Sequence, residues 1–168
     1  MDIGENNMSI LTDREIKENH QLLSPLKEEQ LNPHGYDLAV ESVCINNDLY
    51  DKGEWFDISI PPKTFFIVNT LETVDLLETN VPLVAKMWIK TSFARKGIIL
   101  SDGLIDCGFR GTLNLCCYNA SDSFITLKKG QPFCQIVFEV VNSPDEEYAE
   151  RSGNYQNQKT IMFEGGKQ

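Results

Sequence analysis

The stretch from Gly103 to Asn119 reads GLIDCGFRGTLNLCCYN, and it joins a glycine-rich loop carrying one carboxylate to a run of strand-forming residues. Glycines at positions 103, 108 and 111 would let the backbone turn sharply around Asp106, because glycine adopts conformations that other residues avoid. A tight loop of this kind can present amides to a planar ring and leave one carboxylate pointing into a cleft. On spacing alone, a hairpin-turn role for Asp106 is the commoner interpretation.

Outward from this stretch, short segments rich in β-branched and aromatic residues dominate the chain. Such segments are predicted to be strands, and they are 36–45, 55–60, 64–74, 83–89, 97–100, 112–119, 124–127 and 134–141. Turn clusters of Asn, Asp, Pro and Gly separate them, whereas βαβ units would need helical patterns in those places. The spacing therefore predicts a mainly β sandwich or jelly-roll.

Helical signals are confined to two short places. Near the N-terminus, Thr12 or Asp13 can serve as an N-cap, with Glu15 placed for a capping box. A second helical turn is predicted at 91–96. The sequence thus adds a short N-terminal helix to a β fold.

Length and composition favour one domain over residues 1–168. A chain of 168 residues with 41% hydrophobic content is long enough to bury a core of its own. Residues 1–8 are polar and are predicted to be flexible. The tail, residues 143–168, is polar and has no apolar period, so we expect it to be disordered or ordered only by a ligand or a neighbouring subunit.

Charge and hydropathy exclude two classes of partner. The formal net charge of -10 argues against a surface that binds the phosphates of nucleic acid, because such surfaces concentrate Lys and Arg. The sequence has no run of 18 or more apolar residues and does not begin with a signal-peptide pattern. We therefore expect a cytoplasmic protein that binds neither nucleic acid nor membrane. Any anionic ligand should be bound by a few local donors and not by a basic surface.

The common catalytic and metal motifs are missing from the sequence. It has no GxxxxGK[ST], GxGxxG, HExxH or GxSxG, which removes the common nucleotide-loop, metalloprotease and serine-hydrolase classes. The histidines, His20 and His34, are expected to be solvated. The cysteines are odd in number and form no CxxC pair, so we predict reduced thiols at Cys44, Cys107, Cys116, Cys117 and Cys134.

Two further segments place polar groups in apolar β surroundings. The segment 35–38, GYDL, opens a predicted strand with Asp37, for which an Asx-turn is the alternative role. The segment 90–97, KTSFARKG, carries two hydroxyls and three cations. In a helical turn these groups would converge on an anion-sized space, and a solvated basic loop is the alternative.

Taken in order, these segments resemble the motifs of the homotrimeric family that contains dUTPases and dCTP deaminases. The matching segments are GYDL at 35–38, KTSFARKGI at 90–98, GLIDCGFRG at 103–111, GQPFCQIVF at 130–138 and NYQNQK at 154–159. LTDREI at 11–16 also resembles the opening of the deaminase branch. The resemblance implies a distorted jelly-roll or β-barrel (dUTPase-like, β-clip) protomer with a short N-terminal helix. It also implies a homotrimer with active sites at subunit interfaces, and a pyrimidine deoxyribonucleoside triphosphate bound with Mg2+.

The resemblance also implies roles for individual residues. Asp106 would activate water for attack on the α-phosphorus, and Phe109 would pack against the deoxyribose. The backbone of Gly103, Leu104 and Ile105 would read the pyrimidine edge. Contacts to the phosphates are implied for Lys90, Thr91, Ser92, Arg95, Gln135, Tyr148 and Tyr155. Gln158 would help the tail 143–168 close over them, and Asp37 would hold the metal through water.

Three departures from the family pattern bear on the reaction. Cys116 stands where deaminases carry the glutamate that shuttles protons, and a thiol with an unperturbed pKa near ~8.5 is a poor substitute. Lys90 replaces an arginine, so an ammonium group stands where a guanidinium could donate two parallel hydrogen bonds. Asp102 replaces a small residue of the ring pocket. Cys117, next to Cys116, is expected to be plain strand packing.

These departures favour a pyrophosphatase that converts dUTP and water to dUMP and diphosphate. The base could be uracil, cytosine or a modified pyrimidine. One alternative is a dCTP deaminase, alone or combined with diphosphatase activity. Another is a catalytically silent nucleotide-binding or regulatory protein.

Overall fold

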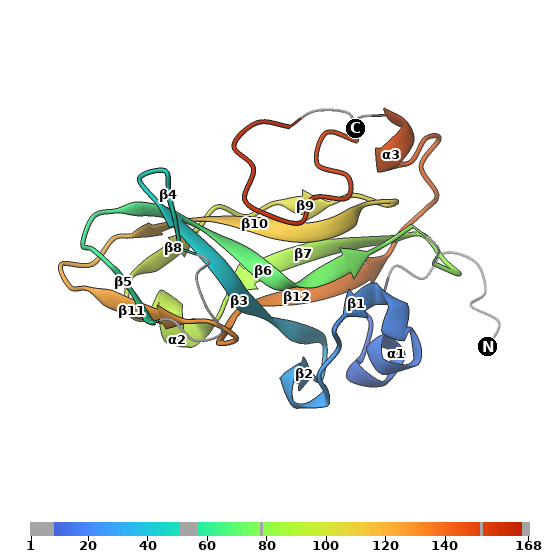
Figure 1. Cartoon of the computed structure of the whole chain (residues 1–168). Helices are drawn as coiled ribbons and strands as arrows, with labels where there is room; N and C mark the ends of the chain where they lie inside the picture. The colour runs from blue at the N-terminus through green and yellow to red at the C-terminus, as the bar shows by residue number, and fades with distance from the viewer. Residues whose placement is uncertain (1–8, 51–56, 78, 152, 166–168) are drawn as a thin grey trace.

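The computed structural model describes residues 9–50, 57–77, 79–151 and 153–165 of the chain. The predicted flexible segment 1–8 and the first two residues of the predicted strand 55–60 lie outside the described residues. Within the described part, ten antiparallel strands form one curled sheet, and two more form a separate ribbon (Figure 1). The mainly β architecture agrees with the sequence prediction.

Seven strands make up the central path of the sheet. From edge to edge they are β8 (Ile98–Leu100), β10 (Arg110–Asn119), β6 (Phe65–Asp75), β3 (Gly35–Ile45), β12 (Pro132–Val140), β7 (Leu83–Ile89) and β9 (Leu104–Ile105). Three short strands pair beside this path, namely β1 (Leu23–Ser24) with β6, and β2 (Leu31–Asn32) and β4 (Asp48–Tyr50) with β3. The ribbon consists of β5 (Asp57–Ile60) and β11 (Ile125–Lys128). Every predicted strand segment therefore has a counterpart in the structure.

The helical elements are short. They are α1 (Asp13–Glu18), η1 (His20–Leu22), η2 (Glu28–Gln30), α2 (Thr91–Ala94) and α3 (Tyr148–Arg151). The capping box predicted for the first helix is present, because the Thr12 side chain accepts from the Glu15 amide while the Glu15 carboxylate accepts from the Thr12 amide. None of the described helices has the length and hydropathy needed to cross a membrane.

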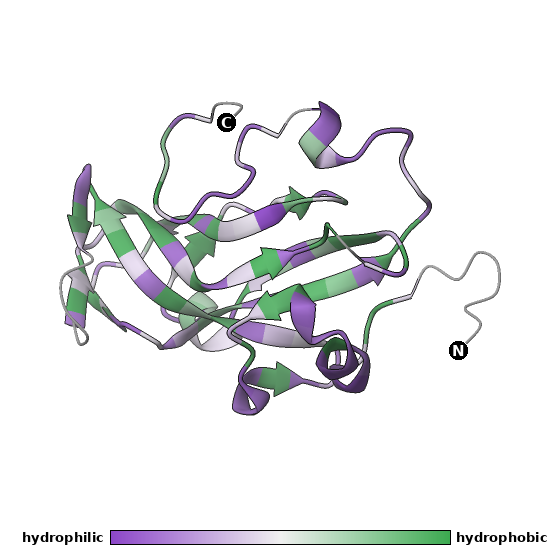
Figure 2. Cartoon of the chain, turned by 45° about the vertical axis from the view of Figure 1, so that its right-hand side comes forward, coloured by the Kyte–Doolittle hydropathy of each residue, from purple (hydrophilic) through white to green (hydrophobic). Residues whose placement is uncertain are grey.

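The sheet curls around one hydrophobic core. Tyr36, Phe66, Phe133 and Phe138 are fully buried there, and burying a side chain of this size contributes roughly 1.5–3 kcal/mol. Green, hydrophobic strands carry this core in Figure 2, whereas α1 and much of the tail are purple. All five cysteines are free thiols and both histidines are exposed, as predicted.

The register of β10 against β6 decides which way its cysteines face. Cys116 pairs with Ile67 and Cys117 pairs with Phe66, and neighbouring residues of a strand point to opposite faces. Cys117 is 1% exposed and packs in the core, as predicted, while Cys116 is half-buried on the outer face. That outer face of β10 is the one over which the tail passes.

The tail folds back along β10 of its own chain (Figure 1). The Asn157 amide donates to the Arg110 carbonyl at 2.7 Å, and the Thr112 amide donates to the Gln158 carbonyl at 2.9 Å. β6 pairs along one edge of β10, and β8 pairs along the opposite edge only at Cys117–Asn119. At Arg110 and Thr112 that second edge is left to the tail. The described residues of the tail therefore have hydrogen-bond partners within their own chain, which the polar composition of the segment did not predict.

Candidate functional site

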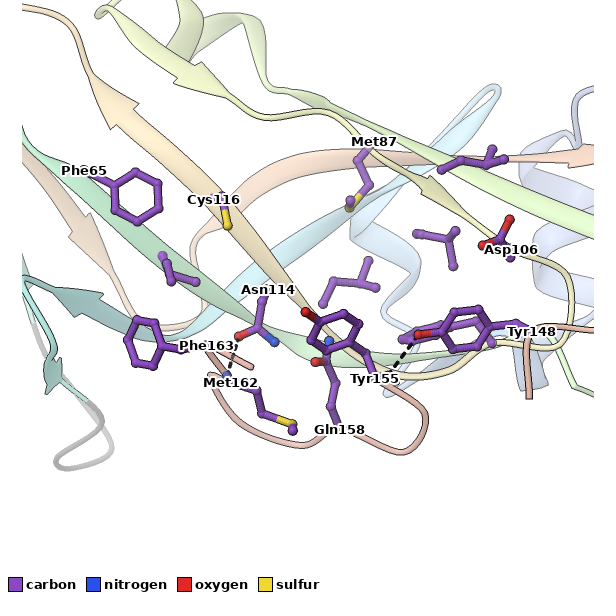
Figure 3. A pocket seen from close by; sticks show the side chains of 15 residues that line it. Phe65, Met87, Asp106, Asn114, Cys116, Tyr148, Tyr155, Gln158, Met162 and Phe163 are labelled. Atoms are coloured by element: carbon purple, nitrogen blue, oxygen red, sulfur yellow. Dashed lines mark hydrogen bonds between the residues drawn. The ribbon is translucent and has the colours of Figure 1, made fainter. Parts of the chain in front are cut away.

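A cavity of about 520 Å³ lies between the tail and the sheet (Figure 3). Strands β6, β7, β9 and β10 supply most of its apolar wall, which includes Ile67, Met87 and Leu113. The polar side chains that line it are Asp106, Asn114, Cys116, Tyr148, Tyr155 and Gln158. Its volume and lining suit a small molecule with an apolar ring and a few polar groups.

Asp106 lies in a tight turn between β9 and β10, at one end of this cavity. The Phe109 amide donates to the Asp106 carbonyl at 3.1 Å, and Gly108 adopts a φ of +82° that favours glycine. The flanking strands do not pair with each other, because β9 pairs with β7 while β10 pairs with β6 and β8. A hairpin-turn role for Asp106 is therefore wrong, and its exposed carboxylate borders the cavity.

Aromatic residues join the Asp106 turn to the tail. The rings of Phe109 and Tyr148 meet edge to face, with centroids 5.7 Å apart. The Tyr148 amide donates to the Cys107 carbonyl at 2.9 Å, and its hydroxyl accepts from the Tyr155 amide at 2.9 Å. The two tail tyrosines and Phe109 thus form one side of the cavity, as Figure 3 shows for the tyrosines.

The close approach of the tail to β10 requires a glycine at position 111, whereas no close contact requires one at position 103. A Cβ on Gly111 would lie 3.1 Å from both the backbone nitrogen and oxygen of Gln158, so the tail passes directly over this residue. At Gly103 nothing lies within 4 Å of such a Cβ, and its φ is not positive. Neither backbone conformation nor close packing therefore requires glycine at 103, although Leu104 and Ile105 after it do line the cavity.

The Cys116 thiol faces the cavity near the end opposite Asp106 (Figure 3). Burial raises the pKa of the Cys116 thiol above its ordinary value, because the charged thiolate would lose its hydration. The group is therefore a neutral thiol near pH 7. It offers no carboxylate chemistry at this position.

A second group of predicted residues lies away from this cavity. Gln135 on β12 pairs in register with Asp37 on β3, and the Lys90 ammonium forms an ion pair with the Asp37 carboxylate. Thr91, Ser92 and Arg95 are exposed on or just after α2. We call these six residues, Asp37, Lys90, Thr91, Ser92, Arg95 and Gln135, the α2 cluster.

The α2 cluster and the cavity are built from different parts of the protomer. Figure 1 places α2 at the lower left and α3 at the upper right. None of the six residues lines the cavity. The structure therefore brings the predicted carboxylate, aromatic and tail residues together and leaves the predicted phosphate-binding residues of the α2 cluster apart.

The described residues offer no ready-made protein cage for a metal ion. They contain no group of three or more His, Cys, Asp or Glu side chains placed to hold one. Both carboxylate oxygens of Asp37 have partners, since Lys90 engages one and the Asn32 amide donates to the other at 3.0 Å. Mg2+ commonly takes one or two carboxylates and completes its coordination with substrate phosphates and water. The exposed carboxylate of Asp106 fits a site of that kind.

Asn114 is a site residue that the sequence analysis missed. Its side-chain amide donates to the Thr160 carbonyl at 3.3 Å, and its carbonyl oxygen accepts from the Met162 amide at 3.3 Å. It therefore fastens the end of the tail over the cavity (Figure 3). An amide side chain between the two leucines of β10, Leu113 and Leu115, was the available signal.

Glu72, on β6, is a second feature that the sequence analysis missed. It is fully buried, and its carboxylate accepts from the Ala39 amide at 2.8 Å, from Gln30 at 3.2 Å and from the Tyr36 hydroxyl at 3.3 Å. Burial raises the pKa of Glu72 despite these donors. This cluster joins β6, β3 and η2 and does not line the cavity.

Known proteins resemble the chain in sequence. Residues 50–141 match the family described as dCTP deaminase-like. A dCTP deaminase from Pyrococcus horikoshii is 38% identical over 144 residues, which cover 84% of this chain and 88% of that protein. A probable deoxyuridine 5'-triphosphate nucleotidohydrolase from Sulfolobus islandicus rod-shaped virus 1 is 28% identical over 160 residues, covering 92% of this chain and 97% of that one.

A solved structure resembles the chain in fold. The 2'-deoxycytidine 5'-triphosphate deaminase from Agrobacterium tumefaciens superposes with a TM-score of 0.67 at 18% identity. The match covers 82% of this chain and 50% of that one, so this chain spans half the length of the Agrobacterium protein. At this identity the likeness concerns the fold alone, and it confirms the predicted β architecture.

Proposed function

We propose that this chain, which belongs to the dCTP deaminase-like family, hydrolyses dUTP to dUMP and diphosphate. One observation carries the proposal. The cavity has an exposed carboxylate at Asp106 and a neutral, half-buried thiol at Cys116, the position for which the family resemblance implies a glutamate in deaminases. The residues for activating water at a phosphorus are thus present, and the proton shuttle for ring chemistry is replaced.

In the proposed reaction, Asp106 accepts a proton from a water molecule as that water attacks the α-phosphorus. The new bond forms between the water oxygen and the α-phosphorus, and the bond from that phosphorus to the bridging oxygen breaks. Diphosphate leaves with the bonding electron pair. Mg2+ bound to the triphosphate would supply positive charge that offsets the charge on the leaving group.

The wall of the cavity supports the placement of the nucleoside. Phe109, Leu104 and Ile105 line the cavity with Asp106. In the proposed complex Phe109 packs against the deoxyribose, and the backbone of Leu104 and Ile105 reads the base. Tyr148 and Tyr155 come from the tail, which lies over the same cavity. We propose that tail residues 143–168 close over bound substrate from this position.

A triphosphate also calls for cationic donors, and among the described residues no Lys or Arg lines the cavity of one chain. The α2 cluster carries those donors, and it faces a different part of the surface. We therefore propose a homotrimer in which the α2 cluster of one chain completes the cavity of a neighbour. Closed cyclic symmetry would then repeat the same junction at every interface.

A dCTP deaminase is the second candidate function. It is favoured by the Pyrococcus horikoshii dCTP deaminase, which is 38% identical over 84% of this chain. Water attack on the cytosine ring needs a group that can take up and return a proton. The neutral thiol of Cys116 does this poorly, which is why we place deamination second.

Product analysis separates these functions. The full chain is incubated with Mg2+ and either dUTP or dCTP, and the nucleotides and diphosphate are resolved by chromatography. Release of dUMP and diphosphate from dUTP is the expected result. Formation of dUTP or dUMP from dCTP would instead show deamination, and binding without turnover would show a silent nucleotide-binding protein.

The position of attack is tested with 18O-labelled water. Attack at the α-phosphorus places the labelled oxygen in the phosphate of dUMP, which mass spectrometry of the products detects. Label in the diphosphate would show attack at the β-phosphorus and would contradict the proposed role of Asp106.

A further inference from the structure

A second hollow, of about 270 Å³, lies where the tail crosses the start of β10. Strands β6 and β10 and the tail all contribute to its wall, which consists of Thr73, Arg110, Gly111, Asn157, Gln158 and Lys159. We call this hollow the tail crevice. Gln158 is the one residue that it shares with the larger cavity of Figure 3, so the tail crevice is a separate feature on the other flank of the tail.

Hydrogen bonds between the tail and the sheet hold the walls of the tail crevice together. The Asn157 amide donates to the Arg110 carbonyl of β10 at 2.7 Å. From β6, the Asn69 side-chain amide donates to the Lys159 carbonyl at 3.5 Å. The docked tail therefore brings its own side chains to the tail crevice beside those of the two strands, and an undocked tail would not.

The tail crevice concentrates positive charge in a chain whose formal net charge is -10. The Arg110 guanidinium lies 3.2 Å from the Asp75 carboxylate through its Nε, which leaves other N–H groups of its planar fork to donate elsewhere. The Lys159 ammonium forms no ion pair within the part of the chain that the structure describes. Two cations thus line this small hollow, and one of them is uncompensated there.

The donors of the tail crevice suit a small oxyanion. Beside the two cations, Thr73 supplies a hydroxyl and Asn157 a carboxamide, and these groups come from different sides of the hollow. A tetrahedral phosphate can accept from several directions at once, whereas a carboxylate presents two oxygens in one plane. The volume lies below the roughly 300–1,000 Å³ of sites for drug-sized ligands, so a whole nucleotide would not fit.

We propose that the tail crevice binds a phosphate-class oxyanion, inorganic phosphate or diphosphate, and that the bound anion fastens the tail to the sheet. Thr73 and Arg110 belong to the sheet, while Asn157 and Lys159 belong to the tail, so an anion between them contacts both. Because only the docked tail completes this set of donors, anion binding and tail docking stabilise each other. The inference does not depend on the proposed reaction, since none of these four residues lines the cavity.

The test measures how fast chymotrypsin cuts the tail of the full chain. Chymotrypsin cleaves after aromatic residues, of which Tyr155 and Phe163 are exposed in the tail, so substitutions of lysine leave its sites intact. Cleavage is followed by mass spectrometry in inorganic phosphate, in diphosphate, in malonate and in chloride, all at equal ionic strength. Calorimetry gives the dissociation constant of each anion, and the comparison of phosphate with diphosphate shows which of the two the tail crevice prefers.

Phosphate or diphosphate, at about ten times its dissociation constant, should slow cleavage roughly 10-fold relative to chloride. Lys159→Gln should raise that dissociation constant about 10-fold and lose the protection, each variant being compared with its own rate in chloride. Lys159→Arg keeps the charge and should keep the protection. Lys17→Gln is the matched control, because it removes one positive charge at an ion pair with Glu28, away from the tail, and should behave like the unmodified chain.

Arg95→Ala separates the tail crevice from the α2 cluster, which also carries cations. Its protection by phosphate or diphosphate should equal that of the unmodified chain, and loss of protection would assign the anion to the α2 cluster instead. The inference would also be overturned by unchanged cleavage of the unmodified chain in both phosphate and diphosphate, or by equal protection of Lys159→Gln. Equal protection by malonate would show a general effect of anions and would remove the phosphate class.

Discussion

The cavity and the α2 cluster differ in what they can bind. The cavity is walled by apolar and aromatic side chains, with one exposed carboxylate at its end. The α2 cluster is open to solvent and combines hydroxyls with the cations of Lys90 and Arg95. A nucleoside triphosphate has an apolar ring and an anionic chain, so each region suits one half of it. In the function we propose, one protomer therefore carries two half-sites that it cannot join by itself.

The largest expected effect comes from the carboxylate of the cavity. Asp106→Asn keeps the shape of the side chain and removes the base, so dUTP hydrolysis should fall by about 10² to 10⁴-fold. Binding of the α,β-imido analogue should persist, since the variant alters the reaction step. Initial rates and calorimetry measure the two quantities.

Asp102→Asn is the matched control for this variant. Asp102 is also exposed and lies four positions earlier, just before β9, but it does not line the cavity. It should lose much less activity than Asp106→Asn. Full dUTP hydrolysis by Asp106→Asn would remove Asp106 from the mechanism.

The next effect comes from the α2 cluster and should appear in binding. Arg95→Ala removes a cation that we place against the phosphates, so KM for dUTP should rise roughly 10-fold to 100-fold with a smaller change in kcat. Arg14→Ala, at an exposed ion pair with Glu18 on α1, serves as the control and should change neither value. An unchanged KM in Arg95→Ala would show that Arg95 does not bind the phosphates of dUTP.

A smaller effect should follow from moving the tail. Gly111→Ala puts a methyl group 3.1 Å from the Gln158 backbone at a φ of +157°, so the tail must shift away from β10. We expect faster proteolysis of the tail and a several-fold higher KM, with the β-sheet circular dichroism retained. Gly103→Ala has open space around it and should behave like the unmodified protein. Equal proteolysis of the two variants would show that the tail does not depend on close approach at Gly111.

The smallest effect on activity is expected at Glu72, which lies in neither half-site. Because burial raises its pKa in the folded state above the ordinary value of 4.5, the folded protein keeps a proton that the unfolded chain releases. The free energy of unfolding should therefore fall as pH rises from about 4.5 through the raised pKa. Urea unfolding across this range should show a weaker fall in Glu72→Gln, which cannot ionise.

Glu41→Gln is the control for this measurement. Glu41 is partly exposed and pairs with Lys129, so its substitution should leave the pH dependence of unfolding near that of the unmodified protein. Parallel pH profiles for Glu72→Gln and the unmodified chain would show that Glu72 carries no raised pKa.

Local patterns in the sequence predicted the elements of the fold well. The strand segments and the capping box of Thr12 and Glu15 depend on neighbouring residues, which a sequence displays directly. The tail could not be predicted in this way, because its order depends on an edge of β10 that becomes available only when the sheet has formed. The tail, residues 143–168, is polar and has no apolar period, so its sequence alone predicted that a ligand or another subunit would order it.

The candidate site was predictable in its members and not in its arrangement. The motif that contains Asp106 and the motif that contains Lys90 follow each other closely in the chain, yet the fold directs them to different surfaces. The buried carboxylate of Glu72 and the unpaired oxygen of Gln158 depend on contacts between distant segments. The order of the motifs in the sequence predicts neither the surfaces on which they lie nor these contacts between distant segments.

Mixing two variants, each impaired in a different half-site, tests most directly whether the two half-sites meet between chains. Asp106→Asn supplies an intact α2 cluster, and Arg95→Ala supplies an intact Asp106. If sites form between neighbours in a trimer, co-expression of the two variants should restore full function in roughly one site in four, measured as dUTP hydrolysis at low substrate concentration. A mixture no more active than the sum of the two separate variants would contradict a site shared between chains.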